Sequence, residues 1–530
     1  MPDRNDNPKE EEEENDGKFL ILGEEETNQA VPLPLTIVPE WVANSTIVSR
    51  RINKDSVSLE EMSALLPADI VESLKSCGIT VLFPIQKEVI PRIVEWNGQF
   101  QPVPVADVCI SSPTGSGKTL CYVVPIVHFL RDRVLPRIRA LVILPTADLA
   151  SQVFDEFVKC TKHTSLSTVL ITGQQKFQND VKKIYKQTDR GLIACCDILV
   201  ATPGRLQDHL HGPLSHAFCL TYLRFLVLDE ADRLLADYDL QWFKEIDNAI
   251  FDSNTAGELD KQHCGGQHLL PPLQVRRFRA TAASCPEELL LAAKFPLQKF
   301  LVSATLAFNS DVIYKIGGLF RPRLFRSKAY RGVGRIGPQM ITFPHNLHEF
   351  FIDCEPTKKP LVVHCLLSRF KHDRVLCFTE TLRHSHRLCE LLRLMGKQVG
   401  EISGYLRHVD RSKMKQSLNS GKLSAIVCTQ IMARGISFDD LGLVICYDPA
   451  RTLQEYAHMA GRTARAGNSG IIITLMSEEE KLRPLMDDRG ACLINRLRPF
   501  DFDFNDLRKS MSMYTEALKM LKTKVNNKNK

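Results

Sequence analysis

Short runs of apolar, often β-branched residues recur along the chain, and helical periodicity follows each run. Uninterrupted apolar runs of this length are typical of parallel strands that are buried on both faces. We therefore predict strands in the first half at 107–111, 140–144, 198–201, 225–228 and 300–303. The same pattern predicts strands in the second half at 374–378, 399–402, 424–428, 443–446 and 470–475. Strands alternating with helices indicate an α/β fold with two tandem domains, each a parallel sheet flanked by helices.

Breaks in this pattern mark the domain boundaries. The first 40 residues include an acidic run at 10–14, which is typical of a disordered tail. An Arg- and Gly-rich stretch at 321–344 lacks periodicity and indicates the junction between the domains. An irregular segment at about 253–296 is either a partner-binding insertion or an unstructured loop. We predict a tail at 1–40, a first domain at 41–328 that carries the insertion, a linker at 329–345, a second domain at 346–505, and a C-terminal helix with a basic tail at 506–530.

Composition narrows the class of protein only slightly. The chain has 530 residues, of which 44% are hydrophobic, and its 68 basic and 62 acidic residues give a net charge of +6. This mild excess permits nucleic-acid binding without requiring it. The 16 cysteines form no C-x-x-C pair, which favours a reduced intracellular protein without structural zinc. We expect neither secretion nor membrane insertion, because no run reaches the roughly 18 apolar residues that a span needs.

One loop carries the strongest chemical signal. It follows the first predicted strand and precedes an amphipathic stretch at 120–130, the context that a phosphate-binding loop requires. Its glycines let backbone N–H groups approach phosphates, its lysine neutralises their charge, and its final threonine can ligate Mg²⁺. A plain Gly-rich turn is the alternative, but such a turn has no need of Lys-Thr after its second glycine. The loop consists of Ser112, Pro113, Thr114, Gly115, Ser116, Gly117, Lys118 and Thr119.

An acidic pair completes this candidate site. Asp229 and Glu230 close the predicted strand at 225–228, so they emerge at the carboxyl edge of the sheet, where ligands bind in such folds. We predict that Asp229 holds Mg²⁺ together with Thr119, while Glu230 orients or deprotonates the attacking water. In isolation the pair would be a solvated acidic turn. Beside the loop, a site for ATP and Mg²⁺ is the better interpretation.

With these elements, the segment 82–475 resembles the DEAD-box RNA helicases of the two-domain RecA-like superfamily. The resemblance implies an ATP-binding helicase domain followed by a helicase C-terminal domain. It implies that Gln86, in Phe-Pro-Ile-Gln, reads adenine, and that Ser303, Thr305 and His458 couple hydrolysis to RNA. It also implies that Arg462 and Arg465 are arginine fingers that stabilise the departing γ-phosphate, although two surface arginines three residues apart are the alternative.

The same resemblance implies RNA contacts in both domains, made to the backbone without base identity. In the first domain helix capping is an alternative for Thr146 and Thr202, and both roles are compatible. The implied set is Pro145, Thr146, Gly173, Thr202, Pro203, Gly204 and Arg205 in the first domain, and Thr379, Arg411, Thr429, Arg434 and Gly435 in the second.

Four positions depart from the family pattern, and one expected aromatic residue is missing. Ala147 replaces an arginine that grips RNA, which predicts weaker RNA binding with a smaller salt dependence. Gln430 and Ser437 replace aspartates and Met459 replaces an arginine, which predicts weaker contacts from the second domain in the closed state. No aromatic residue lies between positions 42 and 82, so Trp41 either stacks on adenine or anchors the N-terminal tail.

These residues leave more than one function open. The first is an ATP-driven RNA helicase, and the second is a weakly hydrolysing, ATP-gated RNA clamp or assembly scaffold. A DNA translocase is disfavoured by Gln86 and by the Asp-Glu-Ala-Asp form. The segments 171–174, 359–363, 374–379 and 514–518 resemble the nucleolar subgroup that acts in large ribosomal subunit assembly. That resemblance implies pre-ribosomal RNA as substrate, ribosome-assembly proteins as possible partners, a monomeric core, and a location in the nucleus and nucleolus.

Overall fold

The protein is described by a computed structural model. The described residues are 39–98, 105–188, 191–215, 218–220, 222–236, 241–251, 297–305, 318–328, 343–371, 373–403, 406, 408–430, 438, 441–481 and 497–528. The predicted acidic tail, except for its last two residues, and the insertion at 253–296 lie outside them, as do Arg434, Gly435 and Ser437.

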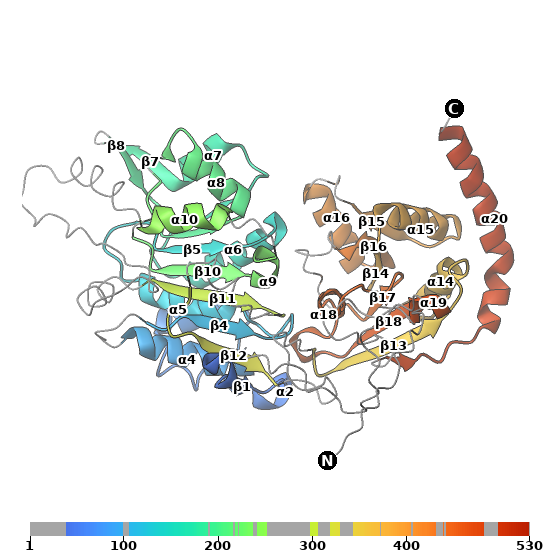
Figure 1. The fold of residues 1–530 in the computed structure, drawn as a ribbon, viewed down its shortest axis with the longest axis horizontal. Helices are drawn as coiled ribbons and strands as arrows, with labels where there is room; N and C mark the ends of the chain where they lie inside the picture. The colour runs from blue at the N-terminus through green and yellow to red at the C-terminus, as the bar shows by residue number, and fades with distance from the viewer. Residues whose placement is uncertain are drawn as a thin grey trace, which may run out of the picture. The chain divides into compact units, whose positions relative to one another are not determined.

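The first sheet has eight strands, and each pairs with its neighbours in parallel (Figure 1). All five strands predicted in the first half are present, with bounds that differ by two residues at most. In spatial order the strands are β1 (Thr46–Val48), β12 (Arg323–Ser327), β4 (Val108–Ser111), β11 (Gln298–Ser303), β10 (Phe225–Asp229), β5 (Ala140–Ile143), β9 (Ile198–Ala201) and β6 (Thr168–Ile171).

Strand β12 corrects the interpretation of the 321–344 stretch as a junction. Arg323 and Arg326, near the start of this stretch, belong to a strand that pairs with both β4 and β1. Leu324 and Phe325, between those arginines, are buried. Buried apolar residues hold the strand in the sheet, while the charged side chains flank it. The linker predicted at 329–345 lies mostly outside the described residues.

Helices cover both faces of the first sheet, and each strand divides its side chains between the two faces. Val227 belongs to one apolar cluster, whereas Leu226 and Leu228 belong to the other. The first cluster includes side chains of α3 (Ala68–Ser76), α4 (Pro84–Gly98), α5 (Leu120–Leu130) and α6 (Ala147–Thr161). The second includes side chains of α7 (Phe177–Ile184), α8 (Pro203–His211), α9 (Ala231–Leu234) and α10 (Gln241–Phe251).

Helix α5 has the predicted bounds but is not amphipathic, although the sequence predicts that it is. Nine of its eleven residues are buried, so it has no polar face and runs through the interior of the domain. Its amphipathic interpretation is therefore wrong. The remaining short elements are α1 (Glu40–Ala43), α2 (Ile52–Asp55), and the antiparallel pairs β2 (Val57–Ser58) with β3 (Val81–Leu82) and β7 (Tyr185–Thr188) with β8 (Gly191–Ala194).

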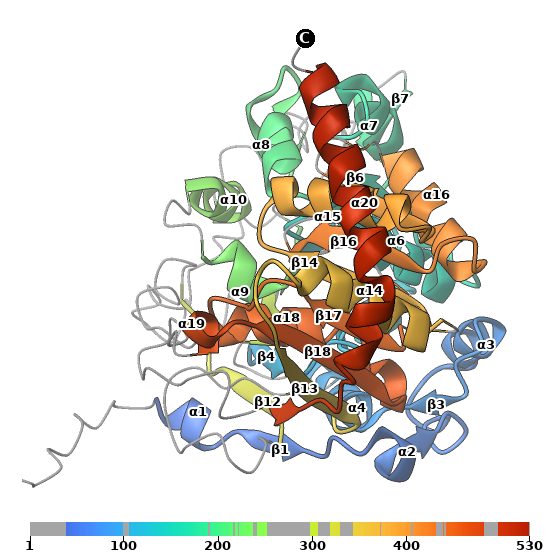
Figure 2. The same cartoon turned by 90° about the vertical axis from the view of Figure 1, so that its right-hand side faces the viewer.

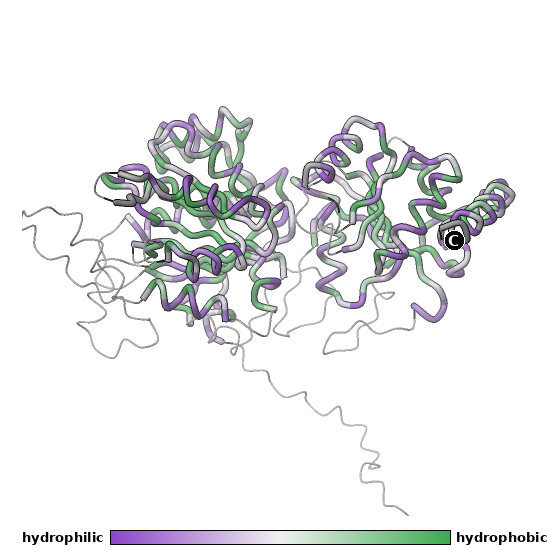
Figure 3. The backbone as a smooth tube through the Cα atoms, turned by 90° about the horizontal axis from the view of Figure 1, so that it is seen from above, coloured by the Kyte–Doolittle hydropathy of each residue, from purple (hydrophilic) through white to green (hydrophobic). Residues whose placement is uncertain are grey.

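The second sheet has seven parallel strands and contains all five strands predicted in the second half. The hydropathy colouring in Figure 3 shows hydrophobic segments running through the interior of both domains. In order the strands are β15 (Val399–Ile402), β16 (Ala425–Thr429), β14 (Val375–Thr379), β17 (Leu443–Cys446), β18 (Gly470–Met476), β13 (Leu347–Asp353) and β19 (Arg498–Pro499). The helices are α14 (Lys359–Arg369), α15 (Leu382–Leu394), α16 (His408–Asn419), α18 (Leu453–Ala460), the 3₁₀ turn η2 (Arg465–Gly467), α19 (Glu478–Lys481) and α20 (Asn505–Lys528).

Helix α20 confirms the predicted C-terminal helix and lies along α14 and α15 (Figure 2). Leu507 and Tyr514 pack into the core of the second domain. Met511, which lies between them in the helix, is 38% exposed, whereas Ala517 is buried. Within the described residues, no helix combines the length and apolar character that crossing a bilayer needs.

Candidate nucleotide and RNA site

The loop from Ser112 to Thr119 connects β4 to α5, as predicted. Gly115 and Gly117 have φ values of +78° and +81°, a conformation that glycine adopts without strain. The loop is also crowded: a Cβ atom at Gly117 would lie 2.3 Å from Gln86 Nε2, and one at Gly115 would lie 2.8 Å from Arg465 Cγ. Both positions therefore require glycine for their backbone angle and for their close neighbours.

Lys118 is held inside this loop. Its Nζ donates to the backbone oxygens of Ser112 at 2.8 Å and Pro113 at 3.0 Å. Burial lowers the pKa of Lys118, and the nearby carboxylates of Glu230 and Asp229 oppose that shift. The ammonium group therefore lies close to both acidic residues of the site, where it can neutralise phosphate charge.

Asp229 is the last residue of β10, and its carboxylate is tied down by two hydrogen bonds. The Tyr122 hydroxyl donates to Oδ2 at 2.7 Å, and the Glu230 backbone N–H donates to Oδ1 at 2.9 Å. Burial, reinforced by the charge of Glu230, raises the pKa of Asp229 to about 6, although Tyr122 and Lys118 act against the rise. Sequence reasoning missed Tyr122, because nothing in an apolar helix pattern indicates which buried tyrosine meets a carboxylate.

Gln86 lies at the start of α4 and contacts the phosphate loop directly. Its Oε1 accepts from the Phe83 backbone N–H at 2.8 Å, and its Nε2 donates to the Gly117 backbone oxygen at 2.9 Å. Gln86 is 2% exposed, so these bonds fix the orientation of its amide. The predicted adenine-reading residue is thus part of the same rigid unit as the phosphate loop.

A cavity of about 740 Å³ joins these groups to the second domain. ATP and Mg²⁺ fit the residues present: Lys118 supplies the cation, and the hydroxyl of Thr119 and carboxylate of Asp229 are oxygen donors of the kind Mg²⁺ prefers. Thr119 and Asp229 both line this cavity. The lining includes Gln86, Gly115, Gly117, Lys118, Thr119, Asp229, Glu230, Arg462 and Arg465.

Arg462 and Arg465 reach this cavity from the second domain. Arg462 is 6% exposed, so it is not a surface arginine, and Arg465 Nε donates to the Gly461 backbone oxygen at 3.1 Å. The loop and the second domain also touch directly, because Thr114 Oγ1 donates to the Gly461 oxygen at 2.8 Å. This is the arrangement that arginine fingers need to reach the γ-phosphate.

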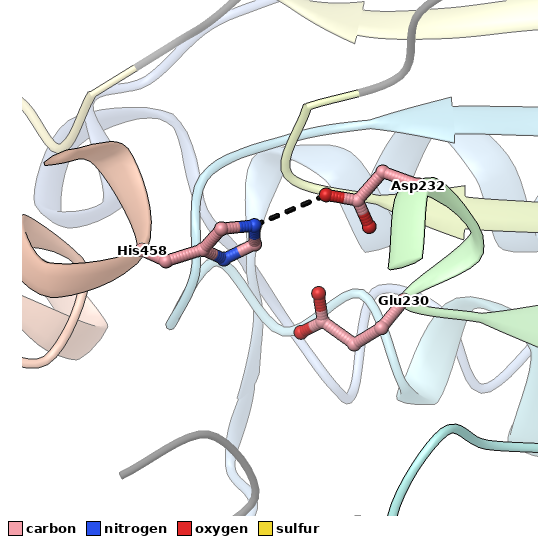
Figure 4. A group of neighbouring side chains, drawn as sticks. All are labelled: Glu230, Asp232 and His458. Carbon is pink, nitrogen blue, oxygen red and sulfur yellow. Dashed lines mark hydrogen bonds and ion pairs between the residues drawn. The ribbon is translucent and has the colours of Figure 1, made fainter. Parts of the chain in front are cut away.

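Asp232 organises a second cluster that connects the two domains (Figure 4). Its Oδ2 accepts from Thr305 Oγ1 at 2.5 Å, Gln454 Nε2 at 2.8 Å and His458 Nε2 at 3.0 Å. Burial alone would raise the pKa of Asp232, but the bonds from His458 and Thr305 outweigh it and hold this pKa well below its usual range.

This cluster brings the predicted coupling residues together. Ser303 Oγ accepts from the Thr305 backbone N–H at 3.0 Å, so Ser303 shapes the turn that presents Thr305. Glu230, Asp232 and His458 also have ligand atoms within 4.8 Å of one another. One Asp232 oxygen already accepts from three protein donors, and the coupling role of the group stays a prediction. The sequence had shown Asp232 only as the end of the Asp-Glu-Ala-Asp segment.

The predicted RNA residues of the first domain follow the carboxyl ends of its strands. Thr146 caps α6 by accepting from the Leu149 backbone N–H at 3.4 Å, so the capping alternative holds for it. Thr202 precedes α8 without a side-chain cap bond. Pro145 and Gly173 lie in loops after β5 and β6, while Pro203 and Gly204 begin α8.

Arg205 has several protein partners. It is 9% exposed, and its Nε donates to Asp180 Oδ2 at 2.7 Å. It also bonds to Asp208 at 3.2 Å and to the Gln175 backbone oxygen. Its guanidinium therefore holds α8 against α7, and its contact with RNA stays a prediction.

In the second domain, Thr379 and Thr429 are register partners at the ends of β14 and β16. Both are buried, and Thr379 Oγ1 bonds to the Thr381 oxygen at 3.2 Å and to Ser385 Oγ at 2.9 Å. Arg411 Nη1 donates to Asp148 Oδ2 of α6 at 3.0 Å, an ion pair that joins the two domains. Their contacts with RNA, and those of Arg434 and Gly435 outside the described residues, stay predictions.

The positions that depart from the family pattern have structural partners of their own. Gln430 Nε2 donates to the Glu455 backbone oxygen at 3.0 Å, and Met459 is buried with its sulfur 3.9 Å from Cys446 Sγ. Ala147 is the first residue of α6. Trp41 packs against the second apolar cluster and is not among the residues that line the nucleotide cavity. The structure thus contradicts adenine stacking by Trp41 and fits the anchoring alternative.

Two parallel α/β sheets with a phosphate loop, an acidic pair and two arginines on one cavity define a two-domain nucleoside triphosphatase. Family models described as "DEAD/DEAH box helicase" and "Helicase conserved C-terminal domain" match residues 83–263 and 358–467. The chain belongs to the DEAD-box ATP-dependent RNA helicases, and it is an RNA-stimulated ATP hydrolase.

Relatives match over most of this chain. It is 34% identical to the human ATP-dependent RNA helicase DDX51 over 96% of its own length and 75% of that protein's. It is 31% identical to ATP-dependent RNA helicase dbp6 of Schizosaccharomyces pombe over 84% and 72%. In fold it is similar to Mss116p bound to ssRNA and AMP-PNP, with a TM-score of 0.63, 20% identity, and coverage of 87% of this chain and 83% of that one.

Proposed function

We propose that the chain uses ATP hydrolysis at the described cavity to remodel or locally unwind pre-ribosomal RNA during large ribosomal subunit assembly in the nucleolus. The observation that carries the catalytic part is the convergence of Asp229 and Glu230 with Arg462 and Arg465 on one cavity. The ribosomal part rests on the resemblance of four segments to the nucleolar subgroup, and on 34% identity to DDX51.

The chain's own groups divide the chemistry of hydrolysis among them. Thr119 and Asp229 would hold Mg²⁺, which when bound neutralises charge on the phosphates. Lys118 also neutralises charge on the phosphates, and Gln86 presents an amide of fixed orientation to the adenine base. Glu230 orients the attacking water or accepts its proton, with a backbone φ of +52° that sets its carboxylate beyond the strand end.

Arg462 and Arg465 complete the site only when the second domain is apposed, so hydrolysis is coupled to closure. The contacts of Thr305, Gln454 and His458 with Asp232 join the acidic segment to both domains and can transmit that closure. RNA that bridges the loops after β5, β9, β14 and β16 would favour the closed arrangement and thereby stimulate hydrolysis.

The alternative is a weakly hydrolysing RNA clamp. Gln430 and Met459 favour it, since each has a partner inside the second domain that holds its side chain. RNA-stimulated ATP turnover in the wild type, with little turnover in Glu230→Gln, supports the helicase. Equally slow turnover in both supports the clamp.

The proposed substrate is tested in cells by sedimentation. We expect the tagged chain to co-sediment with precursors of the large subunit, and Glu230→Gln to accumulate there because it binds ATP and RNA without releasing them. Migration of both proteins away from those precursors, with normal pre-ribosomal RNA processing after depletion, would contradict the ribosomal assignment.

A further inference from the structure

The segment 49–55 precedes the matched helicase model, which begins at residue 83. It is anchored to the first domain, because β1 just before it pairs with β12 at the edge of the first sheet. After β1 the chain continues into α2, which contacts the turn η2 of the second domain. A segment outside the matched model thus lies against the turn that carries Arg465.

That turn has a strained backbone. Ala464, Ala466 and Gly467 have φ values of +55°, +51° and +84°, so three of four consecutive residues are left-handed and two of them have side chains. Such conformations persist only where surrounding contacts hold them, and they concentrate at functional sites. The position of Arg465 therefore depends on what packs against its neighbours.

Two contacts come from the helicase domains themselves. Asn346 Nδ2 donates to the Gly467 backbone oxygen at 2.7 Å, and the Ala466 backbone N–H donates to the Gly115 oxygen of the phosphate loop at 3.2 Å. These bonds fix one side of the turn.

Further contacts come from the segment 49–55. Asn53 Oδ1 lies 2.6 Å from the point where a Cβ atom of Gly467 would be, and Ile52 Cβ lies 3.4 Å from it. Arg50 Nη1 donates to the Phe343 backbone oxygen at 3.2 Å, three residues before Asn346. The segment thus touches the turn directly through Asn53. Through Arg50 it also supports the stretch that carries Asn346, whose side chain bonds to the turn.

A cavity of about 330 Å³ lies among these groups. Its lining includes Asn53, Asn346 and Gly467 as well as the phosphate-loop residues Thr114 and Gly115. An open space therefore adjoins the phosphate loop here, whereas the segment contacts the turn directly. We infer that the segment affects catalysis through the turn and not through the loop.

We propose that Arg50 and Asn53 are positioning residues for Arg465, so that the segment 49–55 sets how well the second arginine finger is placed when the domains close. This inference rests on the proposed hydrolysis, in which Arg465 acts on the γ-phosphate. The segment forms part of a working catalytic unit although it precedes both matched helicase domains.

The test uses the full-length chain with Arg50→Ala and Asn53→Ala combined. The matched control is Arg51→Ala with Lys54→Ala, which removes two exposed cations from the same segment. With saturating RNA we expect kcat for ATP to fall about tenfold in the first variant, with KM changed less than about threefold, because a misplaced finger weakens the transition state more than the ground state. The control should remain within about twofold of the wild type.

A double-mutant cycle identifies the path. If the two residues act through Arg465, adding their substitutions to Arg465→Ala should cost no further activity. Unchanged kcat in the Arg50 and Asn53 variant, or a full additional loss on top of Arg465→Ala, would overturn the proposal.

Hydrogen exchange separates this proposal from the proposed function. In the presence of a non-hydrolysable ATP analogue and RNA, the amides of 464–467 should exchange faster in the Arg50 and Asn53 variant than in the wild type or the control. If the wild type hydrolysed no ATP, faster exchange would still support the positioning contact. Equal exchange in all three proteins would overturn it.

Discussion

Replacing Tyr122 with phenylalanine removes one hydroxyl group from the metal side of the nucleotide site. Tyr122 is fully buried in α5, and its hydroxyl donates to Asp229 Oδ2 at 2.7 Å. A hydrogen bond to a charged group contributes about 1.5–3 kcal/mol. Each 1.4 kcal/mol is a factor of about ten, so a loss of this size predicts Mg²⁺ affinity reduced by about 10–100-fold, which matches the usual effect of removing a partner of a metal ligand.

The assay is a Mg²⁺ titration of the binding of a fluorescent ATP analogue. The matched control is Tyr514→Phe, which also removes one tyrosine hydrogen bond, to the Thr357 backbone oxygen at 2.8 Å, but in the second domain. We expect the half-saturating Mg²⁺ concentration to rise at least about tenfold in Tyr122→Phe only. Superimposable titrations of the wild type and Tyr122→Phe would refute the reasoning that Tyr122 orients the metal ligand.

Three further predictions follow from the described contacts. Arg205→Lys should lower the free energy of unfolding by about 2–4 kcal/mol in urea denaturation, because lysine cannot reproduce the three bonds of the guanidinium to buried Asp180, to Asp208 and to the Gln175 backbone oxygen; an unchanged midpoint would contradict the positioning role. Asp148→Ala and Arg411→Ala should show a coupling of about 1 kcal/mol in a double-mutant cycle of RNA affinity with bound nucleotide, and additive losses would exclude the interdomain pair. Since Asp229 has a pKa of about 6 without metal, its carboxylate gains a proton as pH falls through 6, and apparent Mg²⁺ affinity should drop about tenfold per unit below that value; a flat profile from pH 7 to 5 would contradict this.

The predicted strands were confirmed because a strand buried on both faces shows a local signal, an apolar run that ends at a polar residue. Strand β12 was missed since arginines flank its buried Leu324 and Phe325, and the pairing that holds it in the sheet is not local. The amphipathic interpretation of α5 was wrong because it rested on scattered polar side chains, Tyr122 and His128 among them. The sequence of that stretch does not show that other helices cover its outer face.

The site residues also divide into those that a local sequence motif locates and those that contacts with distant residues place. Residues fixed by short-range motifs, such as Lys118 and Asp229, lie where the loop and strand end require. The family resemblance implies an RNA contact for Arg205 and leaves Trp41 between adenine stacking and anchoring. The structure places both side chains against protein residues that are distant in sequence. Asp232 gained its role only through three donors from two domains.

The central claim is that the groups of both domains form one ATP-hydrolysing site whose activity depends on RNA. Its most direct test is the steady-state ATPase rate of the wild type and of Glu230→Gln, each with and without single-stranded RNA. We predict a rate that RNA raises at least about tenfold in the wild type, and a rate near background in Glu230→Gln with either condition. A wild-type rate that RNA leaves unchanged, or equal turnover in Glu230→Gln, would contradict the account.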